Sequence, residues 1–374
     1  MPHINQLYLS YWSIFRCHYP ANTHTIWKPA MPSTMKAVVF DQSLNIDSPQ
    51  ALFDSQLPIP QAQGSDLLIE VQAISVNPVD AKVRLRALPE KGEPKVLGYD
   101  AVGVVKQVGE DVGLFKVGDQ VFYAGDITRP GSYSEFQLVD ERIVGHKPKN
   151  TSNAQAAAIP LTAITAWEIL FERLLIDVPA KHAQKPPVLL ITGAAGGVGS
   201  MMIQLAKAKT DAIVIATASR DESQQWVNEL GADYVINHHK GIKAELERIG
   251  IESVSHIASL THTHKHFDDY VDVIKPQGKI CLIDDPTEPL NFMALKGKSV
   301  SLIWELMFTR SLFKTEDMIE QHHLLNEVSQ LLDAGKIKST VQLELGTINS
   351  QNLIQAHKKV ESESMVGKIV LEGF

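Results

Sequence analysis

Residues 188–200 read VLLITGAAGGVGS, and this stretch predicts the unit from which the rest of the fold follows. Its first four residues, 188–191, are apolar, which is typical of a strand buried on both faces of a parallel sheet. A glycine-rich turn comes next, and residues 201–209 have the pattern of a helix. The stretch therefore predicts a strand, a tight turn and a helix in direct succession.

Glycines at every third position mark the turn, with one more beside the middle one. A dinucleotide pyrophosphate binds close to such a backbone because no side chain obstructs it, and the following helix N-terminus attracts its charge. The spacing differs from the usual G-x-G-x-x-G, so the prediction also depends on the strand and helix around the turn. The residues expected to contact the cofactor here are Gly193, Ala195, Gly196, Gly197, Val198 and Gly199.

A second apolar run, residues 212–216, follows about twenty residues after the first, where such a unit meets the adenosine ribose. NAD enzymes place an Asp or Glu at the end of this strand, whereas this chain has Thr217, Ser219 and Arg220. An arginine binds phosphate oxygens and no carboxylate repels them, so the sequence predicts NADPH rather than NADH. The alternative is a surface arginine at the start of a helix.

Composition and charge narrow the class of protein. The 374 residues suffice for about two domains, and a content of 44% hydrophobic and 21% charged residues is typical of a globular chain. The net charge is −8 and basic residues do not cluster, so we expect no nucleic-acid partner. Two cysteines, Cys17 and Cys281, form no disulfide framework, which favours a cytoplasmic location. No apolar run approaches the roughly 18 residues of a membrane-spanning helix, so we expect no membrane partner.

Residues 1–34 differ from the rest of the chain. They are rich in aromatic residues and prolines, show no periodicity and lack the features of a signal peptide. We expect either a disordered extension or a start assigned too far upstream, with Met35 as the true first residue. A targeting segment is the alternative.

Residues 35–155 are expected to form one β-rich domain. Proline and glycine turns separate its short strand candidates, as in a partly open β-barrel. The candidates are residues 36–40, 66–75, 103–108, 120–123 and 134–139, and helical periodicity follows over residues 153–171.

Residues 156–306 are expected to form a second domain, in which strands alternate with helices as in a doubly wound parallel sheet. Residues 307–374 then supply an amphipathic helix and strand-like segments that are expected to close back onto the first domain. Helices are predicted at 221–230, 266–274 and 316–334, and strands at 234–236, 255–259, 279–284, 299–307, 340–345 and 368–371.

Several motifs in order resemble the medium-chain dehydrogenase/reductase superfamily: the glycine turn, GADYVIN at 231–237 and GKIV at 367–370. Within it, SVNPVD at 75–80 and DDP at 284–286 resemble the zinc-independent quinone oxidoreductase branch, close to zinc-type alcohol dehydrogenase-like proteins. The resemblance covers residues 35–374. It implies a GroES-like domain, a Rossmann domain, a nicotinamide cofactor in the cleft between them and a homodimer paired through residues 299–307.

Three positions depart from the zinc alcohol dehydrogenases of this superfamily. Asn77 stands where they carry a cysteine ligand, Tyr99 and Asp100 replace the His and Glu of Gly-His-Glu, and Leu161 falls where the third ligand belongs. Catalytic zinc needs three protein ligands, so no metal is expected. The three histidines of THTHKH, residues 261–266, are a rival site, but they begin a helix, where alternate positions diverge.

The resemblance places Asn77 and Tyr99 against the nicotinamide and the substrate. The Asn77 amide and the Tyr99 hydroxyl are therefore the candidate catalytic donors, with solvent as an alternative proton source and a buried structural role as the alternative for each. Asp80 is expected to be a structural partner. Trp304 and Phe308 are expected either to line the substrate pocket or to pack in a core or interface.

The resemblance also implies further cofactor contacts. Thr165 matches a position at the nicotinamide and Lys368 one that reaches the pyrophosphate, the alternatives being a hydroxyl bonded within its own helix and a surface lysine. Further contacts are predicted at the ends of later strands, because open α/β sheets bind ligands there. The remaining cofactor residues are Ser219, Arg220 and His238 around the 2′-phosphate, and Leu260, Thr261 and Ile283 at the strand ends.

Without a metal to polarise a carbonyl, the hydride acceptor must already be activated. The sequence thus predicts an NADPH-dependent, zinc-independent reductase of quinones or α,β-unsaturated carbonyls. The alternatives are an enoyl-thioester reductase, a zinc-type alcohol dehydrogenase and a non-catalytic NADPH-binding sensor or structural protein.

Overall fold

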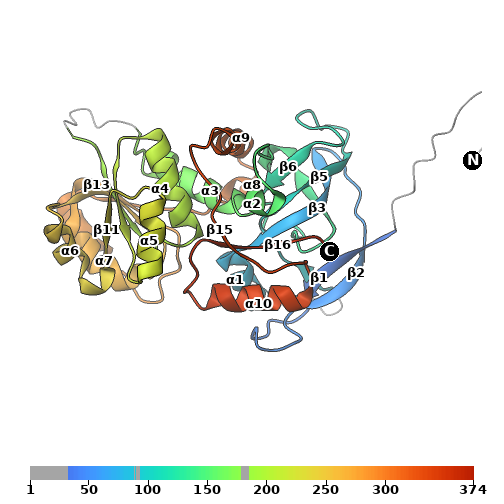
Figure 1. The fold of residues 1–374 in the computed structure, drawn as a ribbon, viewed down its shortest axis with the longest axis horizontal. Coiled ribbons are helices and arrows are strands. Elements are labelled where there is room, and N and C mark those ends of the chain that lie inside the picture. The colour runs from blue at the N-terminus through green and yellow to red at the C-terminus, as the bar shows by residue number, and fades with distance from the viewer. Residues whose placement is uncertain (1–32, 88, 90–92, 178–184) are drawn as a thin grey trace, which may run out of the picture. The chain divides into compact units, whose positions relative to one another are not determined.

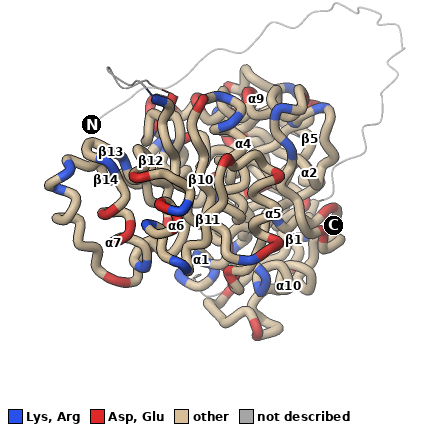
Figure 2. Tube along the Cα trace, turned by 60° about the vertical axis from the view of Figure 1, so that its left-hand side comes forward, with Lys and Arg blue, Asp and Glu red and all other residues tan. Residues whose placement is uncertain are grey.

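The computed structural model describes residues 33–87, 89, 93–177 and 185–374. The expectation for residues 1–34 therefore falls outside the described residues except at its last two positions, and Thr34 already begins the first strand. Figure 1 shows the order of the elements along the chain. Basic and acidic residues are interspersed along the described trace (Figure 2).

β1 (Thr34–Phe40) is the central strand of a three-stranded antiparallel sheet. It pairs with β2 (Phe53–Pro58) on one side and with β4 (Lys95–Val96) on the other. The sequence predicted β1 but neither partner. β2 carries no fully buried residue and β4 has only two residues, so neither has the apolar pattern that marks a strand.

β3 (Asp66–Val76) organises the larger sheet of the N-terminal domain, because it pairs antiparallel with three strands. Its register against β5 shifts after Leu68 and after Val71, and such irregularities bend a strand. The predicted β-rich, partly open barrel is confirmed. The sheet has the order β15-β16-β3-β5-β6-β8 with β7 beside β3, and these strands are β5 (Ala101–Val108), β6 (Gln120–Tyr123), β7 (Phe136–Asp140), β8 (Val144–His146), β15 (Val341–Glu344) and β16 (Lys368–Glu372).

The second sheet is parallel throughout, with the order β11-β10-β9-β12-β13-β14. The order reverses between β9 and β12, and ligands of open α/β sheets bind outside the carboxyl ends of strands at such a point. The doubly wound sheet is thus confirmed. Its strands are β9 (Val188–Thr192), β10 (Ile213–Thr217), β11 (Tyr234–Ile236), β12 (Val254–Ser259), β13 (Ile274–Leu282) and β14 (Ser301–Trp304).

Alternate side chains of β9 enter two different hydrophobic cores. Leu189 and Ile191 lie in the core that contains Met202 of α4, whereas Leu190 lies in the core that contains Phe267 of α7. Helices therefore cover both faces of the sheet (Figure 1). They are α4 (Gly197–Lys209) and α5 (Asp221–Glu229) on one face, and α6 (Ile242–Arg248) and α7 (Thr263–Val273) on the other.

The helical region after β8 corrects one expectation. Asn153–Arg173 is a 21-residue helical run that is apolar and long enough to cross a membrane by length and composition, which the sequence analysis did not find. In its most apolar window 83% of the residues are buried inside the protein, as in a core helix. Pro160 starts a new helix within it, and the run consists of α2 (Asn153–Ala157), α3 (Pro160–Trp167) and a π-helical turn, η2 (Glu168–Arg173).

The C-terminal segment returns to the first domain. β16 pairs antiparallel with β3, and β15 pairs with β16. β14 is shorter than the predicted 299–307, because α8 begins at Thr309. α1 and α10 were not predicted. The buried face of α1 consists of Asp80, Ala81 and Arg84, so it gives no apolar period. The remaining elements are α1 (Pro78–Arg86), α8 (Thr309–Phe313), α9 (Glu320–Asp333), α10 (Ser350–Glu361) and the 3-10 turns η1 (Glu141–Ile143), η3 (His238–Lys240) and η4 (Phe292–Lys298).

Candidate active site

Glycines shape the turn between β9 and α4. Gly193 has a φ of +72°, and a Cβ atom on it would lie 2.9 Å from Thr261 Cγ2. A Cβ atom on Gly199 would lie 2.5 Å from Ala194 Cα. Gly196 caps α4 without a side chain, and the first N–H groups of a helix have no acceptor within it. The turn therefore fits a dinucleotide diphosphate, which needs a close backbone and a helix N-terminus.

Three predicted contacts lie at the neighbouring strand ends. Leu260 and Thr261 follow β12, and Ile283 follows β13. The Leu260 N–H bonds to the last residue of β9 and the Ile283 N–H to the last residue of β12, each at 3.3 Å. The structure thus brings these residues together with the glycine turn at the carboxyl edge of the sheet.

Ser219, Arg220 and His238 lie at the ends of two adjacent strands, β10 and β11. The Arg220 side chain is exposed at the N-terminus of α5, and its Nη2 donates to the carbonyl oxygen of Ser364 at 2.7 Å. His238 is half-buried, with its ring centroid 5.5 Å from that of His266. Burial, and then the neighbouring imidazoles, lower the pKa of His238 to about 4.

Asn77 is buried immediately before α1, and charged partners hold both ends of its carboxamide. Its Nδ2 donates to Asp100 Oδ2 at 2.8 Å, and its Oδ1 accepts a hydrogen bond from Lys368 Nζ. Its backbone N–H donates to Asp80 Oδ2 at 2.6 Å. One N–H of the Asn77 amide group is therefore used internally, and the group carries two.

Asp80 is completely buried, and its carboxylate accepts a hydrogen bond from the backbone of Asn77. Burial, opposed by that hydrogen bond and by the Lys368 ammonium, raises the pKa of Asp80 to about 7. Its Oδ1 atom has no hydrogen-bond partner among the described residues. The geometry agrees with the structural role expected for Asp80.

Tyr99 is buried, with its ring edge-on to Phe308 at a centroid distance of 5.4 Å. Burial, and then the charge of Asp80, raise the pKa of the Tyr99 hydroxyl. The hydroxyl therefore keeps its proton at neutral pH and can only donate or accept a hydrogen bond in its neutral form. Within the described residues, no group forms a hydrogen bond with it.

Lys368 is only 4% exposed, so the surface-lysine alternative is wrong. Its Nζ donates to Val76 O at 3.2 Å and to Asn77 Oδ1, and it lies 3.2 Å from Asp100 Oδ2. Burial lowers the pKa of Lys368 and the Asp100 charge opposes this effect. A Cβ atom on Gly197 would lie 2.7 Å from Lys368 Cδ, so the lysine stem covers the first residue of α4.

Thr165 is buried in α3, and its hydroxyl donates to the Leu161 carbonyl oxygen at 2.8 Å. This is the bond within its own helix that the sequence analysis gave as the alternative to a cofactor contact. The hydroxyl can still accept a hydrogen bond.

The positions that correspond to zinc ligands do come together, but they do not fit zinc. The Asp100 carboxylate accepts hydrogen bonds from Asn77, from Lys368 and, at 2.8 Å, from the Leu161 backbone N–H. Asn77, Asp100 and Leu161 therefore offer an amide, a carboxylate that already accepts three hydrogen bonds and an aliphatic side chain, whereas a zinc site needs three N, S or O ligands around one point. Within residues 33–87, 89, 93–177 and 185–374, no three His, Cys, Asp or Glu side chains are placed to hold a metal ion.

The histidines of residues 261–266 diverge. His262 precedes α7 with a φ of +51°, and its Nε2 lies 3.3 Å from Glu363. The His262 and His264 ring centroids are 6.4 Å apart, and His266 faces His238 instead. The three side chains therefore do not converge on one point.

A buried carboxyl pair lies beside the π-helical turn, and the sequence analysis missed it. Glu168 accepts a 2.7 Å hydrogen bond from Arg310, and Glu305 Oε2 lies 2.6 Å from Arg173 Nε. Burial, and then a hydrogen bond with Glu305, raise the pKa of Glu168 to about 10. Glu168 therefore keeps its proton at neutral pH.

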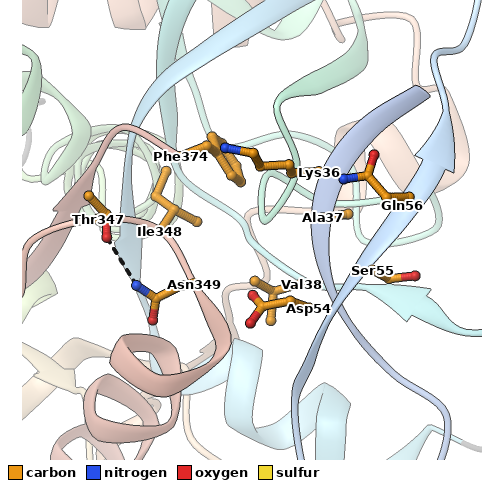
Figure 3. A pocket seen from close by; sticks show the side chains of 10 residues that line it. All are labelled: Lys36, Ala37, Val38, Asp54, Ser55, Gln56, Thr347, Ile348, Asn349 and Phe374. Carbon is orange, nitrogen blue, oxygen red and sulfur yellow. Dashed lines mark hydrogen bonds between the residues drawn. The ribbon is translucent and has the colours of Figure 1, made fainter. Parts of the chain in front are cut away.

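An open pocket of about 520 Å³ lies away from these residues. Figure 3 shows it between Lys36, Gln56, Asn349 and Phe374, and it contains none of the predicted site residues. Asp100 and Ser364 were also missed as site residues. The signal for Asp100 was its place beside Tyr99, but Ser364 contacts Arg220 only through a carbonyl oxygen, for which the sequence holds no signal.

Two families match parts of the chain. The family described as "Alcohol dehydrogenase GroES-like domain" matches residues 63–149, and the one described as "Zinc-binding dehydrogenase" matches residues 197–322. These ranges fall on the β-rich domain and on the region that begins with α4, at the end of the glycine turn.

Relatives that match most of the chain are also dehydrogenase-like or reductase proteins by their names. A zinc-type alcohol dehydrogenase-like protein of Staphylococcus epidermidis is 37% identical over 90% of this chain and 99% of its own length. A 2-methylene-furan-3-one reductase of Solanum lycopersicum is 28% identical over 91% of this chain and 80% of its own length. The crystal structure of a putative zinc-dependent alcohol dehydrogenase protein from Rhizobium etli superimposes with a TM-score of 0.88 at 51% identity, covering 91% and 99% of the two chains. The chain therefore belongs to the medium-chain dehydrogenase/reductase superfamily of oxidoreductases.

Proposed function

We propose that the protein is an NADPH-dependent reductase that transfers hydride to quinones or α,β-unsaturated carbonyls without a metal. The observation that carries the proposal is the buried group of Asn77, Asp100 and Leu161 at the positions that correspond to zinc ligands. Hydrogen bonds join its members to one another and to Lys368, and the group does not offer three zinc ligands. An acceptor that needs no Lewis acid suits such a site.

The residues present fit a bound dinucleotide. The glycine turn and the N-terminus of α4 would hold the diphosphate, Arg220 with Ser219 and His238 the 2′-phosphate, and Leu260, Thr261, Ile283 and Thr165 the nicotinamide half. When bound, the cofactor would supply the hydride. The choice of NADPH over NADH rests on the exposed Arg220 guanidinium at the end of β10.

The chain's own residues would supply hydrogen bonds where negative charge develops on the substrate oxygen. Tyr99 is suited to this role because its hydroxyl stays protonated and forms no internal bond among the described residues. Asn77 would offer its second amide N–H. Phe308 fixes the Tyr99 ring and would help to exclude water from it.

The proposed assembly is a cytoplasmic homodimer with a small-molecule substrate and neither nucleic acid nor membrane as a partner. β14 is the last strand of its sheet, and Trp304, Leu306 and Phe313 beside it are 56%, 51% and 71% exposed. Pairing two such edges across a two-fold axis would cover these apolar side chains.

The test is NADPH oxidation with phenanthrenequinone, an enone, an enoyl thioester and a simple aldehyde, each with and without a chelator. Turnover of the quinone or the enone that the chelator does not affect would support the proposal. Activity with the aldehyde alone, abolished by the chelator, would mean a zinc-type alcohol dehydrogenase. Turnover confined to an enoyl thioester would mean an enoyl-thioester reductase, and NADPH binding without any turnover a sensor or structural protein.

A further inference from the structure

The lysine that begins β16 touches both halves of the candidate site. The residue before it, Gly367, donates its N–H to Ala195 O at 2.9 Å, so this part of the chain is fixed to the glycine turn. The Lys368 stem then covers Gly197, while its ammonium reaches Val76, Asn77 and Asp100 of the other domain. A single side chain therefore spans from the expected diphosphate site to the expected substrate site.

The orientation of the Asn77 amide group depends on the charges at its two ends. The ammonium of Lys368 lies against Oδ1, and the carboxylate of Asp100 lies against Nδ2. A flipped amide would place two N–H groups against an ammonium and an oxygen against a carboxylate, leaving buried polar groups without partners. Asn77 therefore has one orientation as long as both charges are present.

We propose that Lys368 is a positioning residue that links cofactor binding at the glycine turn to the orientation of Asn77. The inference rests on the proposed function for the identity of the two sites. It extends that function because Lys368 acts through Asn77 and Asp100 and not only as a counter-ion of the pyrophosphate. Asp100 competes with a bound diphosphate for the same ammonium.

The link predicts a change in the affinity for NADPH, which can be measured without turnover. Removing the Asp100 charge frees the ammonium for the diphosphate, so the Asp100→Asn variant should bind NADPH more tightly, by about fivefold to tenfold, as for one charge-assisted hydrogen bond. The gain arises from the ammonium that Asp100 otherwise holds, so it must pass through Lys368. In a Lys368→Met background, Asp100→Asn should change the NADPH dissociation constant less than twofold.

Cofactor fluorescence titration of the wild type, both single variants and the double variant measures this cycle. Lys36→Met, which removes an exposed charge on β1, is the matched control and should leave binding unchanged. An Asp100→Asn effect that is absent in the wild-type background, or that persists with Met at position 368, would overturn the link. Asparagine and methionine roughly keep the side-chain shapes, and the double variant removes both charges of the Lys368–Asp100 pair. If Lys368→Met alone fails to fold, Asp100→Asn and the double variant are compared with the wild type, and the double variant must lose the gain in affinity that Asp100→Asn shows.

A second cycle uses turnover. Asn77→Ala should lower kcat about tenfold in the wild type, the effect of one hydrogen bond, and less than twofold in Lys368→Met, where the amide is no longer fixed. The inference would be overturned if Asn77→Ala lowered kcat equally in both backgrounds and Lys368→Met raised only the NADPH dissociation constant. Lys368 would then only anchor the pyrophosphate. If the wild type reduces no quinone or enone, the proposed function fails while the binding cycle still decides the inference.

Discussion

Arg220 Nη2 donates a 2.7 Å hydrogen bond to the Ser364 carbonyl oxygen, so the C-terminal segment fixes a guanidinium at the end of β10. The bond uses one of the five N–H donors of the side chain. The others can bind a phosphate next to the ribose end of the expected cofactor. Arg220 is thus held in place, and no carboxylate in the described part of the chain forms an ion pair with it.

Arg220→Ala should therefore weaken NADPH binding by roughly 1–3 kcal/mol, the value of hydrogen bonds to charged groups, and leave NADH binding nearly unchanged. Isothermal titration with each cofactor measures both. Arg248→Ala, which removes an exposed arginine paired with Glu245, is the control. Equal losses for the two cofactors would show that Arg220 does not contact a 2′-phosphate.

Tyr99→Phe should lower kcat for a quinone or enone about 10²-fold, the effect of one donor to a developing oxyanion, with little change in KM. The fold should be unaffected because the ring contact with Phe308 remains. Since its pKa is raised, the wild-type rate should show no ionisation of Tyr99 between pH 6 and pH 9. Full activity of the variant would assign the proton to solvent.

The Glu168–Glu305 pair should make the folded protein less stable as the pH rises. The folded state holds a proton on Glu168 up to a pH of about 10, whereas the unfolded chain releases it near the ordinary glutamate pKa of 4.5. The contribution is fully present below pH 4.5 and is lost progressively as the pH rises towards 10. In the Glu168→Gln variant the side-chain amide does not titrate, so Tm should fall less between pH 5 and pH 9 than in the wild type. Glu288→Gln, at an exposed residue away from the pair, should keep the wild-type slope.

Gly199→Ala should destabilise the protein by about 1–3 kcal/mol, because its Cβ would meet the Ala194 backbone at 2.5 Å. Gly113→Ala is the matched control, since no atom lies within 4 Å of an added Cβ there. Its effect should stay within about 0.5 kcal/mol. Urea denaturation compares the two, and equal effects would contradict the close approach of α4 to the turn.

Trp304→Asp should dissociate the proposed dimer, because a charge would be buried at the β14 edge. Sedimentation velocity should show a dimer for the wild type and a monomer for the variant. Phe292→Asp, at a 62% exposed residue of η4, is the control for an added surface charge. A wild type that sediments as a monomer would refute the dimer itself.

The two sheets could be predicted because their strands carry apolar runs separated by glycine and proline turns, as in β9 and β3. β2 and α10 could not, since their contacts with the core are made by few residues in otherwise polar segments. The hydrophobic periodicity of a segment reflects only the face of the element that is buried. An element stabilised from a single narrow face leaves little trace in the sequence.

The site residues divide in the same way. The glycine turn could be predicted, because backbone approach restricts the residue type directly. The burial of Lys368 and its partnership with Asp100 could not, because they join residues 268 positions apart. Thr165 shows the limit of a residue-by-residue transfer, since its hydroxyl already bonds to its own helix.

The pairing of β16 with β3 also sets the order in which the chain can fold. The Lys368 ammonium bonds to the Val76 carbonyl oxygen across a separation of 292 residues. During synthesis, at about 5–20 residues per second, Ala73–Val76 of β3 must therefore wait for tens of seconds for β16, whereas β7 can pair early with Asp66–Glu70 on the same edge. The parallel sheet can form in that interval from contiguous sequence. The N-terminal domain, although made first, is completed last.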